Sequence, residues 1–337
     1  MKEGLPLVDK HMVVVLSITY NHAQYVEETL KGFAMQQTDF PFLCCVFDDA
    51  STDGEQEILK RWIEEHCNQD DIEIYNLPLT IILKAPDKDN PNCIYAIHLM
   101  KVNTWGKPER SELLSYWYQF GKYIAMCEGD DYWIDPSKLQ KQVDFLEANP
   151  DYGLVYTQVE SFDENKIIGP IARKITNANS LLLGNYIATL TTCLRSELLL
   201  AYYKEVKPNE KGWLMGDYPM WLWISLHSKI HFFEETMGRY RRLQNSASHS
   251  TDINKTIAFE NSILDIRLFY INKFWNNDKR LLKKVYAINT WKVFKYYREN
   301  HMEELAFKLF LKRYKMLPLK NKIKGLYLWS LFAKRNK

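Results

Sequence analysis

The sequence contains no run of 18 consecutive apolar residues. A helix that crosses a membrane needs about 18 or more such residues, so no membrane-spanning helix is predicted. The first residues, MKEGLP, do not resemble the apolar part of a secretion signal. The six cysteines form no Cys-x-x-Cys pair, and Cys44, Cys45 and Cys127 lie in apolar runs, which is typical of buried thiols in a reducing compartment. We therefore expect a cytoplasmic protein.

The common glycine-rich nucleotide-binding motifs are also missing. The sequence has neither Gly-x-Gly-x-x-Gly nor Gly-x-x-x-x-Gly-Lys-Ser/Thr, the two patterns whose glycines let the backbone approach phosphate groups. It shows no internal repeat and no nucleic-acid recognition module. These absences argue against a dinucleotide-binding domain of the usual kind, against a P-loop and against a nucleic-acid partner.

Acidic residues are absent from the last part of the chain. From Leu305 to Lys337 there are ten Lys/Arg and no Asp/Glu, interleaved with Leu, Phe, Tyr and Trp, although the whole chain has a net charge of only +2. Such a composition is typical of a segment that lies on an anionic membrane surface. The alternative is a helix that packs on the rest of the protein and exposes its lysines. The sequence leaves both interpretations open.

Apolar runs alternate with helical periodicity in the first half of the chain. Met12–Ile18 and Phe42–Phe47 are continuous apolar runs apart from Ser17, as expected for strands that are buried on both faces. Further strands are predicted at Leu79–Leu83 and Tyr123–Cys127, whereas no element is predicted within 84–122. Strands that alternate with helices predict an α/β fold with a mostly parallel sheet.

The second half of the chain has a different pattern. Residues 152–168 are predicted to form a hairpin, and the residues after about 257 have a helical pattern rich in Lys, Tyr and Trp. The predicted organisation is one domain over 1–250, with a nucleotide-binding half at about 10–150 and a mixed half at about 151–250, followed by a helical basic extension over 251–337.

Polar clusters follow three of the predicted strands: Thr19-Tyr20-Asn21, Asp48-Asp49 and Glu128-Gly129-Asp130-Asp131. Parallel sheets bind ligands at the carboxyl ends of their strands. Helix capping or solvated loops would explain each cluster taken alone. A nucleotide diphosphate with a divalent cation would use all of them, because Mg²⁺ and Mn²⁺ prefer carboxylate and phosphate oxygens. The cation would also offset the repulsion within the acidic cluster.

Four segments occur in the order SITYNHAQYVEETL, VFDDASTDGE, GKYIAMCEGDDYW and MGDYPMWLW. Together they resemble the family 2 glycosyltransferases, which are inverting enzymes with the GT-A fold, and among these the bacterial transferases of surface-polysaccharide clusters. The resemblance covers about residues 13–250 except for 84–122. It implies a Rossmann-like nucleotide-binding sheet and the transfer of a sugar from a nucleotide-sugar donor, a UDP-sugar, to a glycan or lipid-linked acceptor.

The resemblance also implies roles for the donor-binding residues. Thr19 and Tyr20, on the first loop, would contact the nucleobase, and Asp49 would accept a hydrogen bond from it. Glu128-Gly129-Asp130-Asp131 corresponds to the D-x-D region of the family, in which Asp130 or Asp131 would bind Mg²⁺ or Mn²⁺. Glu128 stands where Asp is more common, so it reaches either the metal or only the ribose.

The catalytic base implied by the resemblance is Asp217. An acceptor hydroxyl that attacks the anomeric carbon must lose its proton, and a carboxylate can take it. Asp217 also has the position expected of a cap for a helix that starts at Tyr218-Pro219. The two roles are compatible, because a carboxylate at a helix start can also face a cleft.

The polar stretch YRRLQNSASHS, residues 240–250, contains Arg241, Arg242 and His249. Arg suits phosphate recognition, so this stretch is predicted to close over the diphosphate. A solvated loop that leads into the last helices is the alternative.

Two other functions remain open from the sequence. A nucleotidyltransferase would also combine an α/β nucleotide edge with acidic metal ligands, although it would usually carry a phosphate-binding loop rich in glycine and lysine. A catalytically silent sugar-nucleotide-binding subunit could act as a scaffold for glycan assembly. The predicted enzyme would be cytoplasmic, or peripheral on the inner face of the plasma membrane.

Overall fold

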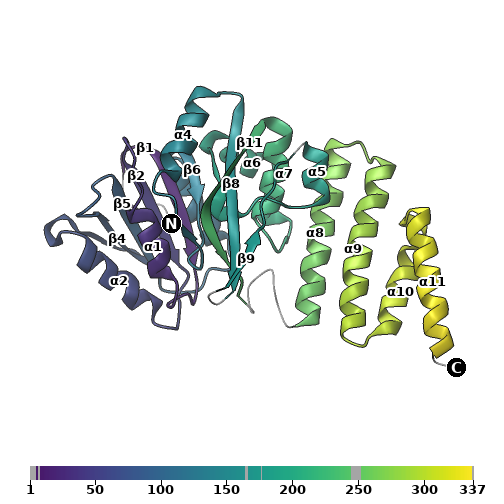
Figure 1. Cartoon of the computed structure of the whole chain (residues 1–337). Coiled ribbons are helices and arrows are strands. Elements are labelled where there is room, and N and C mark those ends of the chain that lie inside the picture. Colours follow the sequence, from purple (N-terminus) through teal and green to yellow (C-terminus); the bar gives the residue numbers. More distant parts are fainter. Residues whose placement is uncertain (1–4, 7, 164–165, 176, 244–251, 336–337) are drawn as a thin grey trace. The chain divides into compact units, whose positions relative to one another are not determined.

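The computed structural model describes residues 5–6, 8–163, 166–175, 177–243 and 252–335, the last five of these by their backbone alone (Figure 1). The chain divides into two compact units. Unit 1 comprises Met1–Thr176, Tyr186–Glu210 and Trp223–Arg242, and unit 2 comprises Asn177–Asn185, Lys211–Leu222 and Leu243–Lys337. The sequence predicted one domain over 1–250 and a helical basic extension over 251–337. That division follows the expected functions of the two parts, and it stays a prediction.

Unit 1 is built on one sheet of 11 strands. The strands are β1 (His11–Thr19), β2 (Phe42–Asp48), β3 (Glu73–Asn76), β4 (Thr80–Pro86), β5 (Cys93–Met100), β6 (Gly121–Met126), β7 (Tyr132–Trp133), β8 (Tyr152–Asp163), β9 (Lys166–Pro170), β10 (Cys193–Arg195) and β11 (Lys229–Arg241). Their order is β3-β4-β5-β2-β1-β6-β10-β8-β11-β7, and β9 pairs with β8.

The centre of the sheet consists of four parallel strands in the order β5-β2-β1-β6. The three consecutive valines of β1, Val13, Val14 and Val15, are fully buried. This explains the continuous apolar run, because both faces of a parallel sheet are covered by helices. The predicted α/β class is confirmed.

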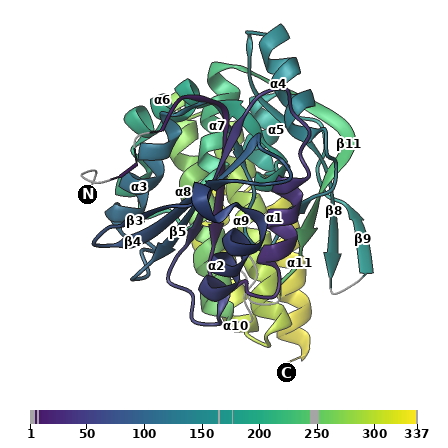
Figure 2. The ribbon, with the colours of Figure 1, turned by 90° about the vertical axis from the view of Figure 1, so that its left-hand side faces the viewer.

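Helices cover this sheet (Figures 1 and 2). Those that lie wholly in unit 1 are α1 (Val26–Ala34), α2 (Glu55–His66), α3 (Pro108–Tyr118), α4 (Lys138–Ala148) and α6 (Ser196–Val206). Right-handed crossovers place α1 and α2 on the same face. The crossover through α3 runs in the opposite direction along the sheet, from β5 to β6, so α3 covers the other face.

The stretch without a predicted element contains β5 and α3. The predicted strand Leu79–Leu83 corresponds to β4, which is antiparallel to β5 rather than parallel. Helix α3 buries the consecutive residues Tyr116, Trp117 and Tyr118. A helix that is buried on several sides has no simple apolar stripe, so its sequence shows no helical periodicity.

The rest of the sheet is mixed, as predicted. The hairpin consists of β8 and β9, which pair antiparallel. Strand β10 pairs antiparallel with both β6 and β8, and β8 pairs parallel with β11. Strand β11 also pairs with β7, which directly follows the acidic loop, so it brings Arg241 close to that loop.

Unit 2 is helical. It contains α5 (Ala178–Leu183), the first residues of α7 (Asp217–His227), α8 (Ile253–Phe274), α9 (Lys279–Glu299), α10 (Glu303–Arg313) and α11 (Leu319–Arg335). Buried Phe294, Phe307 and Phe310 join α9 and α10 in one apolar cluster. The predicted helical C-terminal region is confirmed. In the part of the chain that the structure describes, no helix combines the length and the apolar character that a membrane crossing requires.

Candidate active site

Loops from the central strands meet at the carboxyl edge of the sheet. β1 ends at Thr19, and β6, its parallel neighbour, ends at Met126. The loop after β6 lies directly on the end of β1, where Gly129 N donates to Ile18 O at 3.1 Å. A Cβ atom at Gly129 would lie 2.1 Å from Thr19 Oγ1, so only glycine fits. The glycine of the acidic motif is therefore required by this close approach.

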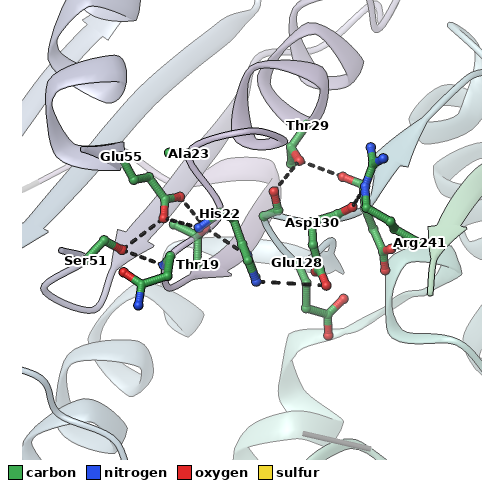
Figure 3. A network of polar contacts seen from close by, with 12 residues as sticks. Thr19, His22, Ala23, Thr29, Ser51, Glu55, Glu128, Asp130 and Arg241 are labelled. Atoms are coloured by element: carbon green, nitrogen blue, oxygen red, sulfur yellow. Dashed lines mark hydrogen bonds and ion pairs between the residues drawn. The ribbon is translucent and has the colours of Figure 1, made fainter. Parts of the chain in front are cut away.

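A buried carboxylate, Glu55, organises the first loop (Figure 3). It accepts hydrogen bonds from Thr19 Oγ1, from His22 N at 2.8 Å and from Ser51 Oγ at 2.9 Å. Burial raises the pKa of the Glu55 carboxyl group. The sequence analysis did not single out Glu55. A local signal existed, because the polar stretch Ser51-Thr52-Asp53-Gly54 is typical of a helix start and Glu55 is the first residue of α2.

His22 connects this network to the acidic loop. Its Nδ1 atom lies 3.2 Å from Thr19 Oγ1, and its Nε2 atom lies 4.0 Å from Asp130 Oδ2 (Figure 3). The second distance is too long for a hydrogen bond, so the imidazole faces the carboxylate without a direct bond. His22 was also missed from the sequence. His22 therefore joins Thr19 and Asp130 among the polar side chains of the candidate site.

The neighbouring aspartates of the acidic loop differ in environment. Asp131 is buried, and its Oδ1 atom accepts a hydrogen bond from Arg241 N at 2.7 Å. Burial, followed by the charges of Asp130 and Glu128, raises the pKa of Asp131 well above its usual value. Asp130 faces His22 and keeps 17% of its side chain exposed. Figure 3 shows Glu128 beside Asp130. The carboxylate of Asp130, rather than that of Asp131, is thus open at this edge.

Arg241 lies against the acidic loop and brings a positive charge to it. Its Nε donates to Asp130 O at 2.9 Å, and its Nη2 bonds Glu28 of α1. The guanidinium carbon lies 4.2 Å from the ring centroid of Tyr25 and 4.5 Å from that of Phe162. Only 10% of the side chain is exposed. Arg241 therefore holds the loop in place, and its predicted contact with the diphosphate stays a prediction.

The structure describes the polar stretch only up to Leu243. Arg242 N donates to Phe162 O at 2.9 Å, which extends the strand pairing of this region. His249, predicted to contact the diphosphate, lies outside the described residues.

Asp49 is buried at the same edge and is bonded to a loop that the sequence did not predict. Its Oδ1 atom accepts from Thr104 N at 2.7 Å and from Thr104 Oγ1 at 2.6 Å, and Oδ2 accepts from Arg110 Nη1 at 3.1 Å. The guanidinium of Arg110 lies 5.1 Å from the ring centroid of Trp105, whose side chain is exposed. Tyr20 is also exposed. The predicted contacts of Tyr20 and Asp49 with a nucleobase stay predictions.

Asp217, the predicted catalytic base, belongs to unit 2 and is the first residue of α7. Asn185 Nδ2 donates to Asp217 Oδ2 at 3.4 Å. Burial raises the pKa of the Asp217 carboxyl group, while a hydrogen bond from the backbone of Tyr218 acts in the opposite direction. A carboxylate with a raised pKa is a stronger base, which suits the predicted role.

The acidic edge offers carboxylate oxygens that a divalent cation could use. Among the described residues, no group of three or more His, Cys, Asp or Glu side chains is arranged to bind a metal. Mg²⁺ is often bound by one or two carboxylates together with substrate phosphates. Asp130, with Glu128 beside it, fits that kind of donor set.

The chain resembles known proteins in sequence. Residues 14–79 match the family described as "Glycosyl transferase family 2". An uncharacterized protein of Mycobacterium tuberculosis is 28% identical over 241 residues, and the match spans 70% of this chain but only 60% of that protein's length. An uncharacterized glycosyltransferase of Methanocaldococcus jannaschii is 25% identical over 296 residues, with 86% of this chain and 87% of that protein covered.

The fold matches solved structures as well. S. aureus TarS in complex with UDP-GlcNAc is 13% identical, with a TM-score of 0.59 over 92% of this chain and 82% of TarS 1–349. The mannosyltransferase PcManGT of Pyrobaculum calidifontis, in complex with GDP-Man and Mn²⁺, is 15% identical, with a TM-score of 0.54 over 99% of this chain and 83% of that chain.

These likenesses show that the chain has the GT-A fold of the glycosyltransferases. The segment that matches family 2 of these enzymes, residues 14–79, includes the first loop, Asp49 and Glu55 of the candidate site.

Proposed function

We propose that this enzyme transfers a sugar from a nucleotide-sugar donor, a UDP-sugar, to a glycan or lipid-linked acceptor in surface polysaccharide synthesis, with inversion at the anomeric carbon. The observation that carries the proposal is the presentation of Asp130 at the carboxyl edge of the sheet, fixed by Arg241 and facing His22. TarS was solved with UDP-GlcNAc and PcManGT with GDP-Man, which supports a sugar nucleotide as the donor.

Asp130, with Glu128 beside it, would hold Mg²⁺ or Mn²⁺ together with the donor diphosphate. If Asp131 binds the metal as well, it would do so through Oδ2, because its Oδ1 atom accepts the hydrogen bond from Arg241 N. A bound divalent cation supplies positive charge that stabilises the leaving diphosphate. PcManGT contains Mn²⁺, which supports a divalent cation here.

Asp217 would act as the general base. It would take the proton of the acceptor hydroxyl as that oxygen forms its bond to the anomeric carbon, while the bond from that carbon to the diphosphate oxygen breaks. One direct displacement inverts the configuration. The raised pKa of Asp217 supports this role, because a more basic carboxylate takes the proton more readily.

The basic C-terminal segment would bind an anionic membrane surface on the cytoplasmic side. Lipid-linked acceptors lie in that surface, whereas sugar nucleotides are water-soluble. The ten positive charges after Leu305, without any negative charge, support this location.

Product analysis tests the proposed reaction. The protein would be incubated with a panel of nucleotide sugars, Mn²⁺ and a membrane lipid extract. The expected products are a glycoside with inverted anomeric configuration, identified by NMR, and free nucleoside diphosphate. Release of pyrophosphate would indicate a nucleotidyltransferase instead, and binding of the donor without any product would indicate a silent subunit.

A further inference from the structure

Helix α11 packs against unit 2 through one side only. Gly325 is buried, and a Cβ atom there would lie 2.1 Å from Phe310 Cε2. Leu328, three residues later, is half-buried against the apolar cluster that contains Phe310. The packed side of α11 therefore passes through Gly325 and Leu328, because residues three apart lie on the same side of a helix.

Over residues 319–327, the opposite side of α11 is apolar but exposed. Leu319, Ile323, Leu326 and Tyr327 have exposed fractions of 72%, 60%, 42% and 62%. Their spacing of 4, 7 and 8 residues from Leu319 places them on one stripe of the helix. We call these four residues the outer stripe. Such a stripe is unfavourable in water unless something covers it.

Lysines border the outer stripe. At 100° per residue, Lys320 and Lys324 lie along one margin and Lys322 along the other. The Nζ atoms of Lys322 and Lys324 lie 4.8 Å and 4.6 Å from the ring centroids of Tyr314 and Trp291, so both ammonium groups lie over aromatic rings of unit 2. An apolar stripe with lysine margins is typical of helices that lie in the interface of a bilayer.

Charge decides between a membrane and a second copy of this chain. No acidic residue occurs between Leu305 and Lys337. Two outer stripes packed together would bring their lysine margins into repulsion, which disfavours self-association. Anionic headgroups would instead neutralise the margins while the acyl region covers the stripe.

Helix α10 has a different role. Its residues Ala306, Phe307 and Phe310 are buried in the cluster with Phe294 of α9. Most of its apolar surface therefore belongs to the fold, and α10 serves as the support that presents α11.

We propose that the outer stripe of α11 docks into an anionic bilayer, with its lysine margins at the headgroups and the helix axis in the plane of the membrane. The inference rests on the membrane attachment proposed above and identifies the surface that makes it. It also predicts that attachment depends on apolar insertion as well as on charge.

The test uses the full chain and sedimentation with vesicles of phosphatidylglycerol and phosphatidylcholine at low salt. Ile323→Ser/Tyr327→Ser should lower the partition coefficient about tenfold or more, because it removes inserted apolar area without changing charge. Lys320→Gln should lower it roughly fivefold. Ile74→Ser/Leu200→Ser, which changes two exposed apolar residues of unit 1, should bind as the unchanged protein does. Circular dichroism and melting temperature check that each variant is folded.

The proposal would be overturned if the folded Ile323→Ser/Tyr327→Ser variant binds the anionic vesicles as strongly as the unchanged protein. It would also be overturned if the unchanged protein binds vesicles of phosphatidylcholine alone as strongly as anionic vesicles. Sedimentation velocity without lipid tests whether a second copy of this chain covers the outer stripe instead. A dimer that the serine substitutions abolish would assign the outer stripe to self-association and contradict the proposal. No donor or acceptor is present in these measurements. Failure of vesicle binding would therefore leave the proposed transfer reaction standing, and an inactive protein that binds vesicles would refute only the reaction.

Discussion

Asp130 and Asp131 are adjacent in the sequence, but their carboxylates face different surroundings. Asp131 is buried and bonded to the backbone of Arg241, whereas Asp130 is partly exposed beside His22. The sequence predicted the cluster but not the difference between its members. That difference depends on Arg241, which lies 111 residues further along the chain than Asp130. No local pattern reveals such a contact.

Arg241→Lys tests the role of that contact. A lysine keeps the charge but has no planar fork to donate to both Asp130 O and Glu28. We expect a folded protein whose affinity for UDP with Mn²⁺, measured by calorimetry, falls about tenfold, as expected for the loss of a charged hydrogen bond. Arg61→Lys is the matched control, because it changes an exposed arginine that pairs with Glu27 of the same helix α1. Unchanged affinity in Arg241→Lys would show that the loop needs no such support.

Asp217→Asn tests the proposed base. Asparagine keeps the shape and can still cap the helix, but it cannot take a proton. Loss of a general base typically lowers the rate by about 10²- to 10⁴-fold. We expect that loss in kcat, with nearly unchanged binding of the donor in a thermal shift assay. Normal turnover would place the base at another residue.

The same residue predicts the pH dependence of turnover. Burial raises the pKa of Asp217 above the usual aspartate value. The base works only when deprotonated, so kcat should fall as the pH drops through this raised pKa, at a higher pH than for an ordinary aspartate of about 3.9. A profile of kcat against pH would show this acidic limb. A limb at the value of an exposed aspartate would contradict the effect of burial.

At the scale of elements, the sequence predicted β1, β2, β6 and the β8–β9 hairpin, whose apolar runs and turn residues are local signals. It missed β5, although CIYAIHLM is a largely apolar run. It also missed α3, because this helix buries neighbouring bulky residues rather than one stripe. Thr104 and Arg110, which bind Asp49, were missed with them. The carboxyl ends of the strands could be predicted, whereas the side chains that reach them from other elements could not.

Gly129→Ala tests the close approach of the β1 and β6 loops. The new Cβ atom would lie 2.1 Å from Thr19 Oγ1 and would force the loops apart. Overpacking of this kind costs about 1–3 kcal/mol, so the melting temperature should fall by several degrees. Gly216→Ala is the control, because its Cβ atom would meet nothing within 4 Å. Equal melting temperatures for the two variants would show that the loop relaxes freely.

At the scale of the whole molecule, acidic and basic features belong to different units. Unit 1 carries the acidic edge with Asp130, and unit 2 carries the basic segment from Leu305 to Lys337. The resemblance in four short segments was enough to predict the GT-A fold and the match of residues 14–79 to the family 2 glycosyltransferases. The donor sugar and the acceptor were not predictable from the sequence, because recognition of a sugar depends on a few side chains brought together by the fold.

The central claim is that Asp130 binds a nucleotide diphosphate through a divalent cation. The most direct measurement compares the melting temperatures of the unchanged protein and of Asp130→Asn with UDP or GDP, with and without Mn²⁺. Saturating ligand at 100 times its Kd stabilises the native state by about 2.7 kcal/mol. We expect one nucleotide to raise the melting temperature of the unchanged protein by several degrees only with Mn²⁺, and Asp130→Asn to lose this rise while melting normally without ligand. An equal rise in Asp130→Asn, or no rise with either nucleotide in the unchanged protein, would contradict the claim.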